Sequence, residues 1–316
     1  MNKISELETA QENYMLVSDI SNKLRPKPSY PTYPPYHRGK YLEEYFFDFY
    51  QRNVDRFENL RRKYIPIFWT NCYVNGVQEG WGEKVSMTDI QREINNYCNP
   101  KLPLTDSYFT VCQHDDAPMN PLPQNTIVFS AGGNVTGPTV VPIPLICGPL
   151  AKLDRRDNKY LASFVGSTTH NIRNKMIEHM KDKDDIYLST KGWDQNIHID
   201  QFTDFINSSL ESKFVLCPRG YGASSFRLYE AMQLGAIPVY ISDRFWLPFT
   251  YELNWNEFCV PITEDNIENL YEILESIDDE TYQKMTKKIE EVYTNYFTLE
   301  GTCNKILQRL EWEYNT

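Results

Sequence analysis

The chain has 316 residues, which is long for one hydrophobic core and comfortable for two domains. Apolar residues make up 41% of it and aromatic residues 14%, so the bulk of the chain is not intrinsically disordered. The formal net charge of -11 argues against nucleic acid or an anionic membrane surface as the main partner, because both are polyanions.

The cysteines and the N-terminus bear on the cellular compartment. Seven cysteines are scattered without any C-x-x-C spacing, so neither a zinc site nor a disulfide framework is predicted. Residues 1–19 are charged and polar and contain no apolar stretch of the length that a signal peptide or a membrane anchor needs. We therefore expect a cytoplasmic protein with no membrane span.

The first part of the chain predicts an extended arm followed by mixed structure. Residues 1–36 form a leader and an arm in which prolines alternate with tyrosines, a composition that favours an extended surface segment. Aromatic and charged residues recur at helical spacing over 41–63, and 64–72 is strand-like. The strand-like runs that follow are 108–113, 126–129 and, broken by two prolines and expected at an irregular edge, 140–146.

The second half alternates strands with helices. Strands are predicted at 160–165, 185–188, 214–217, 236–241 and 258–261. Helices are predicted at 171–181, 201–208, 226–234, 266–277, 279–293 and 302–314. Because a parallel pair of strands needs a crossover connection, this alternation predicts an α/β protein with two Rossmann-like, doubly wound domains facing across a cleft.

Residues 213–249 carry the densest chemical signal, because they combine a strand, a turn, a helix and a second strand. Gly220 and Gly222 allow the backbone of the turn to approach a ligand closely. The first amides of the following helix point outward with the positive end of its dipole, and Ser224 or Ser225 is expected to cap that helix. This turn therefore predicts an anion site, and Gly235 is expected to end the helix.

Charged side chains extend the predicted anion site. Arg219 lies in the turn and Arg227 in the first turn of the helix, and guanidinium forks suit a diphosphate. Glu230 lies three residues after Arg227 on the same helix face, where a carboxylate can accept hydrogen bonds from ribose hydroxyls. The alternative is a surface Arg-Glu pair of little energetic worth.

These residues occur in an order that resembles a known family. The runs CPRG at 217–220, S-x-RL-x-EA at 225–231, LG-x-IPV at 234–239, SD at 242–243 and LPF at 247–249 are similar to the donor-site signature of the exostosin-type glycosyltransferases. The run FVGS at 164–167, with His170 and Arg173 downstream, resembles the opening of the donor domain in that family. The resemblance implies that the donor-binding residues are Ser167, His170, Arg173, Arg219, Tyr221, Gly222, Ser225, Arg227 and Glu230.

The resemblance also implies an architecture and an activity. The expected fold is GT-B, with an acceptor-side domain at 37–155, a nucleotide-sugar donor domain at 156–298 and a helix at 299–316 that crosses back to the first domain. The expected activity is that of a hexosyl- or pentosyltransferase that moves a sugar from a nucleoside diphosphate, UDP above all, to a hydroxyl of a glycan or glycoconjugate acceptor. Inversion at the anomeric carbon is implied. The UDP-sugar is a co-substrate, and no cofactor is expected.

Two features bear on the mechanism. No compact D-x-D follows a strand to hold a divalent ion, and the acidic cluster at 182–185 is typical of a solvated loop, so metal-independent transfer is expected. Asp115 and Asp116 follow the strand predicted at 108–113 and are candidates for the acceptor base, with only one of them facing the cleft if the chain there is extended. A pair of turn-capping aspartates beside His114 is an equally open interpretation.

Two other functions remain open from the sequence. One is a nucleotide-sugar epimerase on the same two-domain plan, and the other is a catalytically silent carbohydrate-binding protein. Tryptophans in strand-like surroundings belong more often to the core than to a sugar-stacking surface, which applies to Trp69, Trp81, Trp193 and Trp246.

Overall fold

The computed structural model describes residues 41–70, 105–118, 122–146, 149–150, 152–193 and 198–315. The chain divides into two compact units: unit 1 contains Met1–Ser130, Val135–Val141 and Cys303–Thr316, and unit 2 contains Ala131–Asn134 and Pro142–Thr302. The domain limits expected from the sequence stay predictions, because compact units and independently folding domains need not share limits. The leader and arm at 1–36, as well as Trp81, lie outside the described residues.

Unit 1 contains a four-stranded sheet in the order β1-β2-β3-β4. Its strands are β1 Arg62–Tyr64, β2 Ser107–Cys112, β3 Thr126–Ser130 and β4 Val140–Pro142. Strand β2 pairs in parallel with both β1 and β3. All of β3 and nearly all of β2 are buried, as expected for parallel strands covered on both faces.

The sequence predicted the two central strands of unit 1 and misjudged the first. The predicted strands at 108–113 and 126–129 are confirmed, and 140–146 is a three-residue edge strand followed by irregular backbone. A strand at 64–72 is wrong, because β1 ends at Tyr64 and Trp69 begins a helical turn. The apolar run is explained by burial of Ile65, Ile67 and Phe68 in irregular backbone.

An aromatic core joins the helices of unit 1 to its sheet. Helix α2 spans Leu42–Arg52 and α3 spans Val54–Phe57, so the helical pattern at 41–63 is interrupted at Asn53. The Phe46 ring meets the Phe109 ring of β2 edge-on at 6.0 Å, and the Phe57 ring stacks on Phe109 at 6.0 Å. These contacts hold α2 and α3 against β2.

Unit 2 contains a five-stranded parallel sheet in the order β6-β5-β7-β8-β9. Its strands are β5 Tyr160–Ser167, β6 Ile186–Lys191, β7 Ser212–Pro218, β8 Ile237–Ser242 and β9 Val260–Thr263. Its helices are α6 Asn171–Met180, α7 Ile199–Leu210, α8 Phe226–Gln233, α9 Leu270–Glu275 and α10 Asp279–Tyr296. The last helix of the chain, α11, spans Leu299–Asn315, and 264–269 forms a 3₁₀ helix where the sequence predicted the start of an α-helix. No helix in the described part of the chain is long and apolar enough to cross a membrane.

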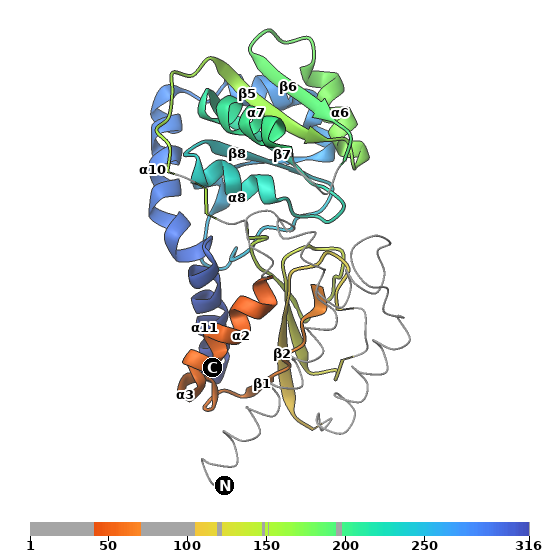
Figure 1. The fold of residues 1–316 in the computed structure, drawn as a ribbon, viewed down its shortest axis with the longest axis vertical. Coiled ribbons are helices and arrows are strands. Elements are labelled where there is room, and N and C mark those ends of the chain that lie inside the picture. Colours follow the sequence, from red (N-terminus) through yellow and green to blue (C-terminus); the bar gives the residue numbers. More distant parts are fainter. Residues whose placement is uncertain are drawn as a thin grey trace. The chain divides into compact units, whose positions relative to one another are not determined.

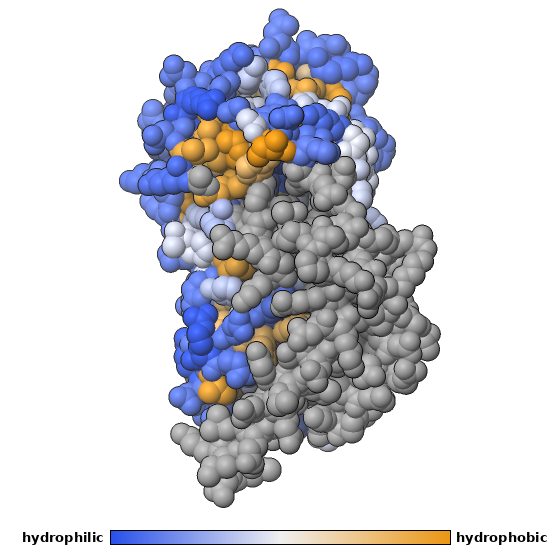
Figure 2. Space-filling view, viewed as in Figure 1, coloured by the Kyte–Doolittle hydropathy of each residue, from blue (hydrophilic) through white to orange (hydrophobic). Residues whose placement is uncertain are grey.

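The strand order of unit 2 places helices on both faces of its sheet. The chain passes from β5 to β6 on one side, then crosses to β7 on the other, so right-handed crossovers put α6 on one face and α7 and α8 on the opposite face. Figure 1 shows α7 and α8 over the same face, and α6 contacts α9. Figure 2 shows an apolar area on the surface of this face of unit 2. Ile199, the first residue of α7, is one of the exposed large apolar residues. The doubly wound arrangement expected from the sequence is confirmed for this unit.

This order also creates a topological switch point between β5 and β7, because the chain leaves these neighbouring strands in opposite directions. In open α/β sheets, ligands bind beyond the carboxyl ends of the strands at such a point. The strand ends there are Ser167 of β5 and Pro218 of β7.

Helix α8, which follows β7, ends as the sequence predicted. Gly235 has a φ of 69°, the left-handed conformation that glycine adopts without a Cβ penalty. The Gly235 amide donates to the Met232 carbonyl at 3.0 Å, and the Ala236 amide donates to the Ala231 carbonyl at 3.0 Å. These two bonds satisfy carbonyl groups that the helix end would otherwise leave unpaired.

Candidate functional site

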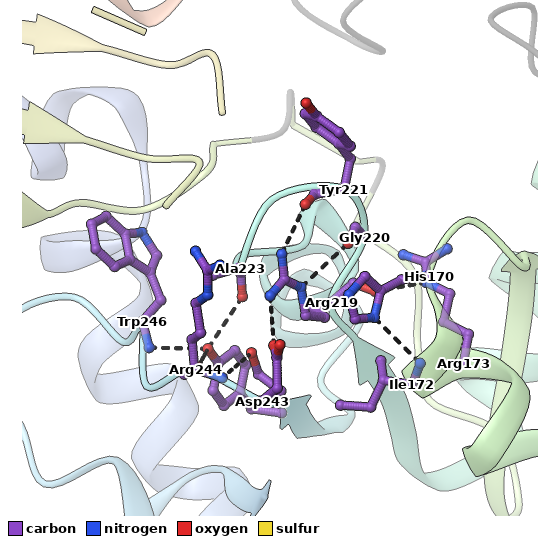
Figure 3. A network of polar contacts seen from close by, with 12 residues as sticks. His170, Ile172, Arg173, Arg219, Gly220, Tyr221, Ala223, Asp243, Arg244 and Trp246 are labelled. Carbon is purple, nitrogen blue, oxygen red and sulfur yellow. Dashed lines mark hydrogen bonds and ion pairs between the residues drawn. The ribbon is translucent and has the colours of Figure 1, made fainter. Parts of the chain in front are cut away.

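The carboxyl edge of the unit 2 sheet brings together three turns that the sequence had marked. The turn after β5 carries Ser167 and His170, the turn after β7 carries Arg219 to Ser225, and Asp243 and Arg244 follow β8. Figure 3 shows His170, Arg173, Arg219 and Asp243 in one network of polar contacts. Residues separated by up to 76 positions in the sequence, from Ser167 to Asp243, therefore contribute to one edge.

Arg173 joins the two strands at the switch point. Its Nη1 donates to the Ser167 carbonyl at 2.7 Å, its Nη2 to the Pro218 carbonyl at 3.2 Å, and its Nε to the Arg219 carbonyl at 2.9 Å. Burial and the nearby charge of Arg227 lower the pKa of Arg173 to about 10, which leaves it charged at neutral pH. A Cβ on Gly220 would lie 3.3 Å from Arg173 Nη2, so this glycine permits the close approach. Arg173 thus fixes the ends of β5 and β7.

Arg219 is a buried cation that stabilises its own turn. Only 3% of the residue is exposed. Its Nη1 donates to Asp243 Oδ1 at 2.5 Å, its Nη2 to the Tyr221 carbonyl at 2.8 Å, and its Nε to the Gly220 carbonyl at 3.4 Å. Burial would raise the pKa of Asp243, but the hydrogen bond and charge of Arg219 outweigh it and hold this pKa below its ordinary value. The sequence did not reveal Asp243 as the counterion.

Arg227 and Glu230 form a pair on the first turns of α8. Arg227 Nη1 donates to Glu230 Oε2 at 2.8 Å, and Nη2 donates to the Val165 carbonyl at 2.9 Å. The guanidinium also lies 3.4 Å from the centre of the Phe205 ring. The two side chains are 21% and 6% exposed, so the alternative of a weak surface pair is wrong. Burial raises the pKa of Glu230, and the charge of Arg227 opposes that rise.

His170 caps helix α6. Its Nδ1 accepts a hydrogen bond from the Ile172 amide at 3.3 Å. Burial and the positive charges of Arg219 and Arg173 lower its pKa. The imidazole is therefore neutral at neutral pH, and the acceptor role of Nδ1 assigns the proton to Nε2. Nε2 is then a hydrogen-bond donor at this edge.

The remaining predicted donor residues lie on the turn after β7. The Tyr221 side chain is exposed, and Gly222 is buried. Ser225 is the N-cap of α8 with extended backbone, but its side chain forms no capping hydrogen bond. The Ser224 hydroxyl is buried next to the Tyr229 hydroxyl and does not cap the helix. Ser225 therefore occupies the expected N-cap position, but no side-chain hydrogen bond caps α8 among the described residues.

A short segment of the chain packs against this turn. The Ser224 amide donates to the Gly132 carbonyl at 3.2 Å, and Trp246 Nε1 donates to the Ala131 carbonyl at 3.2 Å. Gly133 has a φ of 91°, and a Cβ there would lie 2.8 Å from the Trp246 ring. Trp246 is buried, as the core interpretation predicted, whereas Trp193 is exposed and that interpretation is wrong for it. Residues 131–134 thus form part of the wall behind the turn.

The turn after β2 in unit 1 carries the candidate bases. His114, Asp115 and Asp116 lie in a turn, since β2 ends at Cys112 and the Ala117 amide donates to the His114 carbonyl at 3.4 Å. The premise of an extended chain that aims the two aspartates to opposite sides is therefore wrong. Both aspartates are partly buried.

Glu43 holds this turn and was not singled out from the sequence. The side chain is fully buried, and its Oε1 accepts from the Thr70 amide at 3.0 Å, the Thr70 hydroxyl at 2.6 Å and the Gln113 amide at 3.0 Å. Oε2 has no hydrogen-bond partner among the described residues. Burial raises the pKa of Glu43, although its hydrogen bonds oppose that rise. In the sequence it reads only as one of two acids in the first turn of a helix.

His114 is a neutral neighbour of the aspartates. Burial lowers its pKa to about 4, against the opposing charge of Asp116. Its Nδ1 accepts from the Asp116 amide at 3.2 Å, so the proton of the neutral ring lies on Nε2. A ring in this state has no free nitrogen lone pair, which makes His114 a poor candidate for the base.

Comparison with known proteins identifies the family. The probable glycosyltransferase At3g07620 of Arabidopsis thaliana is 31% identical over 140 residues, which cover 44% of this chain and 28% of that protein. The exostosin-1 homolog of Caenorhabditis elegans is 29% identical over 166 residues, covering 45% of this chain and 42% of that protein. The matched region thus spans less than half the length of these relatives.

A solved structure of TarM aligns with 72% of this chain and 58% of its own at 10% identity and a TM-score of 0.38. The Exostosin GT47 domain family matches residues 111–277, a range that includes both the turn after β7 and the end of β2. This match covers more than half of the chain, which therefore belongs to the exostosin GT47 family.

Proposed function

We propose that the protein is a glycosyltransferase that moves a sugar from a UDP-sugar to a hydroxyl of a glycan or glycoconjugate acceptor. The observation that supports this most is the charge at the carboxyl edge of the unit 2 sheet. The interacting groups there are three guanidinium groups, of Arg173, Arg219 and Arg227, and two carboxylates, of Glu230 and Asp243, so this cluster carries one net positive charge. Arg244, which also follows β8, adds a further positive charge at the same edge. That excess lies beside the N-terminus of α8 in a protein whose net charge is -11.

The three arginines have different roles in this proposal. Arg173 and Arg219 donate their hydrogen bonds to carbonyl groups and to Asp243, so they fix the shape of the turn that receives the diphosphate. Arg227 is more exposed than Arg219 and lies in the first turn of α8, where it meets the diphosphate. In glycosyl transfer the departing diphosphate gains negative charge in the transition state, and fixed donors placed there stabilise it.

The other donor residues complete the proposed site. Glu230 accepts hydrogen bonds from ribose hydroxyls, and His170 donates one from Nε2. The remaining contacts come from Ser167, Tyr221, Gly222 and Ser225. The positive edge neutralises the leaving group, so the proposed transfer is independent of a metal ion. Inversion at the anomeric carbon is part of the proposal because the resemblance to the exostosin family implies it. Asp115 or Asp116 removes the proton from the acceptor hydroxyl.

One set of measurements tests the proposal and its rivals. The pure protein is first screened against nucleoside diphosphates and UDP-sugars by thermal shift, because a ligand that binds only the native state raises the melting temperature. Turnover is then followed with a panel of glycan acceptors. Released UDP that increases with an acceptor and persists in excess EDTA supports the proposal. An isomerised donor would indicate an epimerase, and binding without turnover a silent carbohydrate-binding protein.

A further inference from the structure

Asp243 differs from the proposed donor-site residues because it follows strand β8. It follows β8 directly, at the carboxyl edge of the sheet, beside the turn that follows β7. Its side chain is 31% exposed, whereas that of its partner Arg219 is 4% exposed. The ion pair therefore has a buried cation and a partly exposed carboxylate. Figure 3 shows the Asp243 carboxylate next to the Arg219 guanidinium.

The hydrogen bonds of the pair explain which member can bind a ligand. Arg219 donates to two carbonyl groups of its own turn and to Asp243 Oδ1, so its guanidinium is engaged by the protein. Asp243 Oδ2 accepts no hydrogen bond from another residue in the described part of the chain. A carboxylate that Arg219 keeps ionised is a pure hydrogen-bond acceptor.

The charges around Asp243 define the ligand class. A second anion is disfavoured next to a carboxylate, whereas hydroxyl groups donate to it without a change in net charge. Arg219 neutralises Asp243, so the carboxylate repels a diphosphate bound nearby less than an unpaired carboxylate would. A polyhydroxylated, uncharged ring next to a diphosphate fits both conditions.

We propose that Asp243 recognises the transferred sugar: its carboxylate accepts hydrogen bonds from hydroxyls of a neutral sugar and disfavours a uronic acid. This inference rests on the proposed transfer from a UDP-sugar and adds the class of sugar. Arg219 is the positioning residue that fixes the carboxylate. A site built to accept a hydroxyl discriminates strongly against a ligand that lacks it or replaces it with an anion.

The alternative role for Asp243 is that of a counterion for Arg219 alone. A counterion stabilises the turn equally for every ligand. Its loss would therefore weaken the binding of UDP and of UDP-sugars by the same factor. A sugar-binding carboxylate acts only on the part of the affinity that the sugar adds to UDP. The two roles therefore differ in a ratio of dissociation constants, which does not depend on the total amount of folded protein.

The experiment measures, by calorimetry, the binding of UDP, UDP-glucose, UDP-galactose, UDP-xylose and UDP-glucuronate to the wild type and to Asp243→Asn. Asparagine keeps an oxygen for Arg219 but weakens the acceptor. At least one neutral UDP-sugar is expected to lose about 10- to 100-fold in affinity, the usual worth of a charged hydrogen bond, while UDP changes less than about twofold. The affinity for UDP-glucuronate is expected to increase relative to the affinity for that neutral UDP-sugar. Asp279→Asn is the matched control, since Asp279 forms an exposed pair with Lys213 in the same unit.

The outcomes separate the inference from the function on which it rests. Equal weakening of UDP and all UDP-sugars in Asp243→Asn makes Asp243 a counterion only and overturns the inference. A wild-type protein that binds neither UDP nor any UDP-sugar overturns the proposed function itself. If Asp243→Asn does not fold, Asp243→Glu, which displaces the carboxylate by one methylene, must reorder the affinities among the UDP-sugars. An unchanged order in that variant also overturns the inference.

Discussion

The turn after β2 and the turn after β7 both leave the carboxyl end of a buried parallel strand, but they are stabilised by opposite kinds of group. The turn after β2 is anchored on the carboxylate of Glu43, which accepts from two backbone amides and a hydroxyl. The turn after β7 is anchored on guanidinium groups, which donate to carbonyl groups and to Asp243. The difference shows how one fold prepares two electrostatic environments.

In the proposed transfer reaction, each environment suits one half of the chemistry. A turn that carries two aspartates and a neutral histidine favours removal of a proton, because carboxylates accept protons and the neutral ring adds no positive charge beside them. A turn fixed by arginines favours the accumulation of negative charge on a leaving group. Four predictions test this contrast, and they are given in order of decreasing effect.

The largest effect is expected at the proposed base. Asp115→Asn or Asp116→Asn should lower kcat by about 10² to 10⁴-fold, because proton removal by a positioned base contributes that much to the rate. UDP affinity should stay unchanged, since the proposed donor residues all lie in unit 2. Turnover and UDP binding of both variants are the measurements. Near-normal turnover in both variants would mean that the base lies outside this turn.

Removal of Glu43 should cost almost as much, but in stability. Glu43→Ala leaves two buried amides and the Thr70 hydroxyl without their acceptor, with an expected loss of about 3 to 5 kcal/mol in the free energy of unfolding. Urea denaturation measures it. Glu43→Gln, which retains one acceptor oxygen, is the control and should lose less. Equal losses in the two variants would mean that the retained oxygen and the side-chain volume contribute little, and that the negative charge of Glu43 explains the effect.

The neutral state of His114 predicts a pH dependence. Its pKa is 6.5 in an unfolded chain and about 4 in the folded one, so between these values the unfolded state binds more protons. Stability should therefore fall by about 3 kcal/mol as the pH decreases from about 6.5 to 4.

Glu43 acts with the opposite sign, because its raised pKa adds stability at low pH that is lost as the pH rises. The quantity to compare is therefore the difference between the wild type and His114→Gln, measured as unfolding free energy at several pH values. Parallel curves for the two proteins would contradict the buried, neutral state of His114.

The smallest of the four effects is expected at Arg227. Arg227→Lys keeps a cation for Glu230 but loses the guanidinium fork, and UDP binding should weaken by about 1.5 to 3 kcal/mol. Arg156→Lys is the matched control, because Arg156 forms an exposed pair with Glu211 in the same unit. Calorimetry with UDP gives both values. An affinity equal to that of the control would place the diphosphate elsewhere.

Local signals in the sequence were sufficient for much of unit 2. The β7-α8-β8 unit, the role of Gly235 and the pairing of Arg227 with Glu230 follow from periodicity, turn chemistry and helical spacing. These features depend on residues a few positions apart. The donor-site assignment itself came from an ordered set of residues shared with a family, not from geometry.

Long-range contacts set the rest and could not be predicted. Glu43 meets Gln113 across 70 positions, and Arg173 meets the Pro218 carbonyl across 45. Which acceptors a guanidinium uses depends on the groups packed around it, so the sequence could not show that Arg219 is buried against Asp243. The turn at 114–116 could have been predicted from the sequence, because the run Asp-Asp-Ala-Pro at 115–118 is typical of a turn.

Residues 131–134 have a consequence for gene engineering. They belong to unit 2, although the chain on both sides of them belongs to unit 1. Neither unit is therefore one continuous segment of the sequence. A fragment excised as 142–302 would lack the carbonyl groups of Ala131 and Gly132, and the Trp246 indole and Ser224 amide would lose their acceptors. An exchange of unit 2 between relatives therefore has to include residues 131–134 as a separate segment, because otherwise the turn after β7 loses the backbone that packs against it.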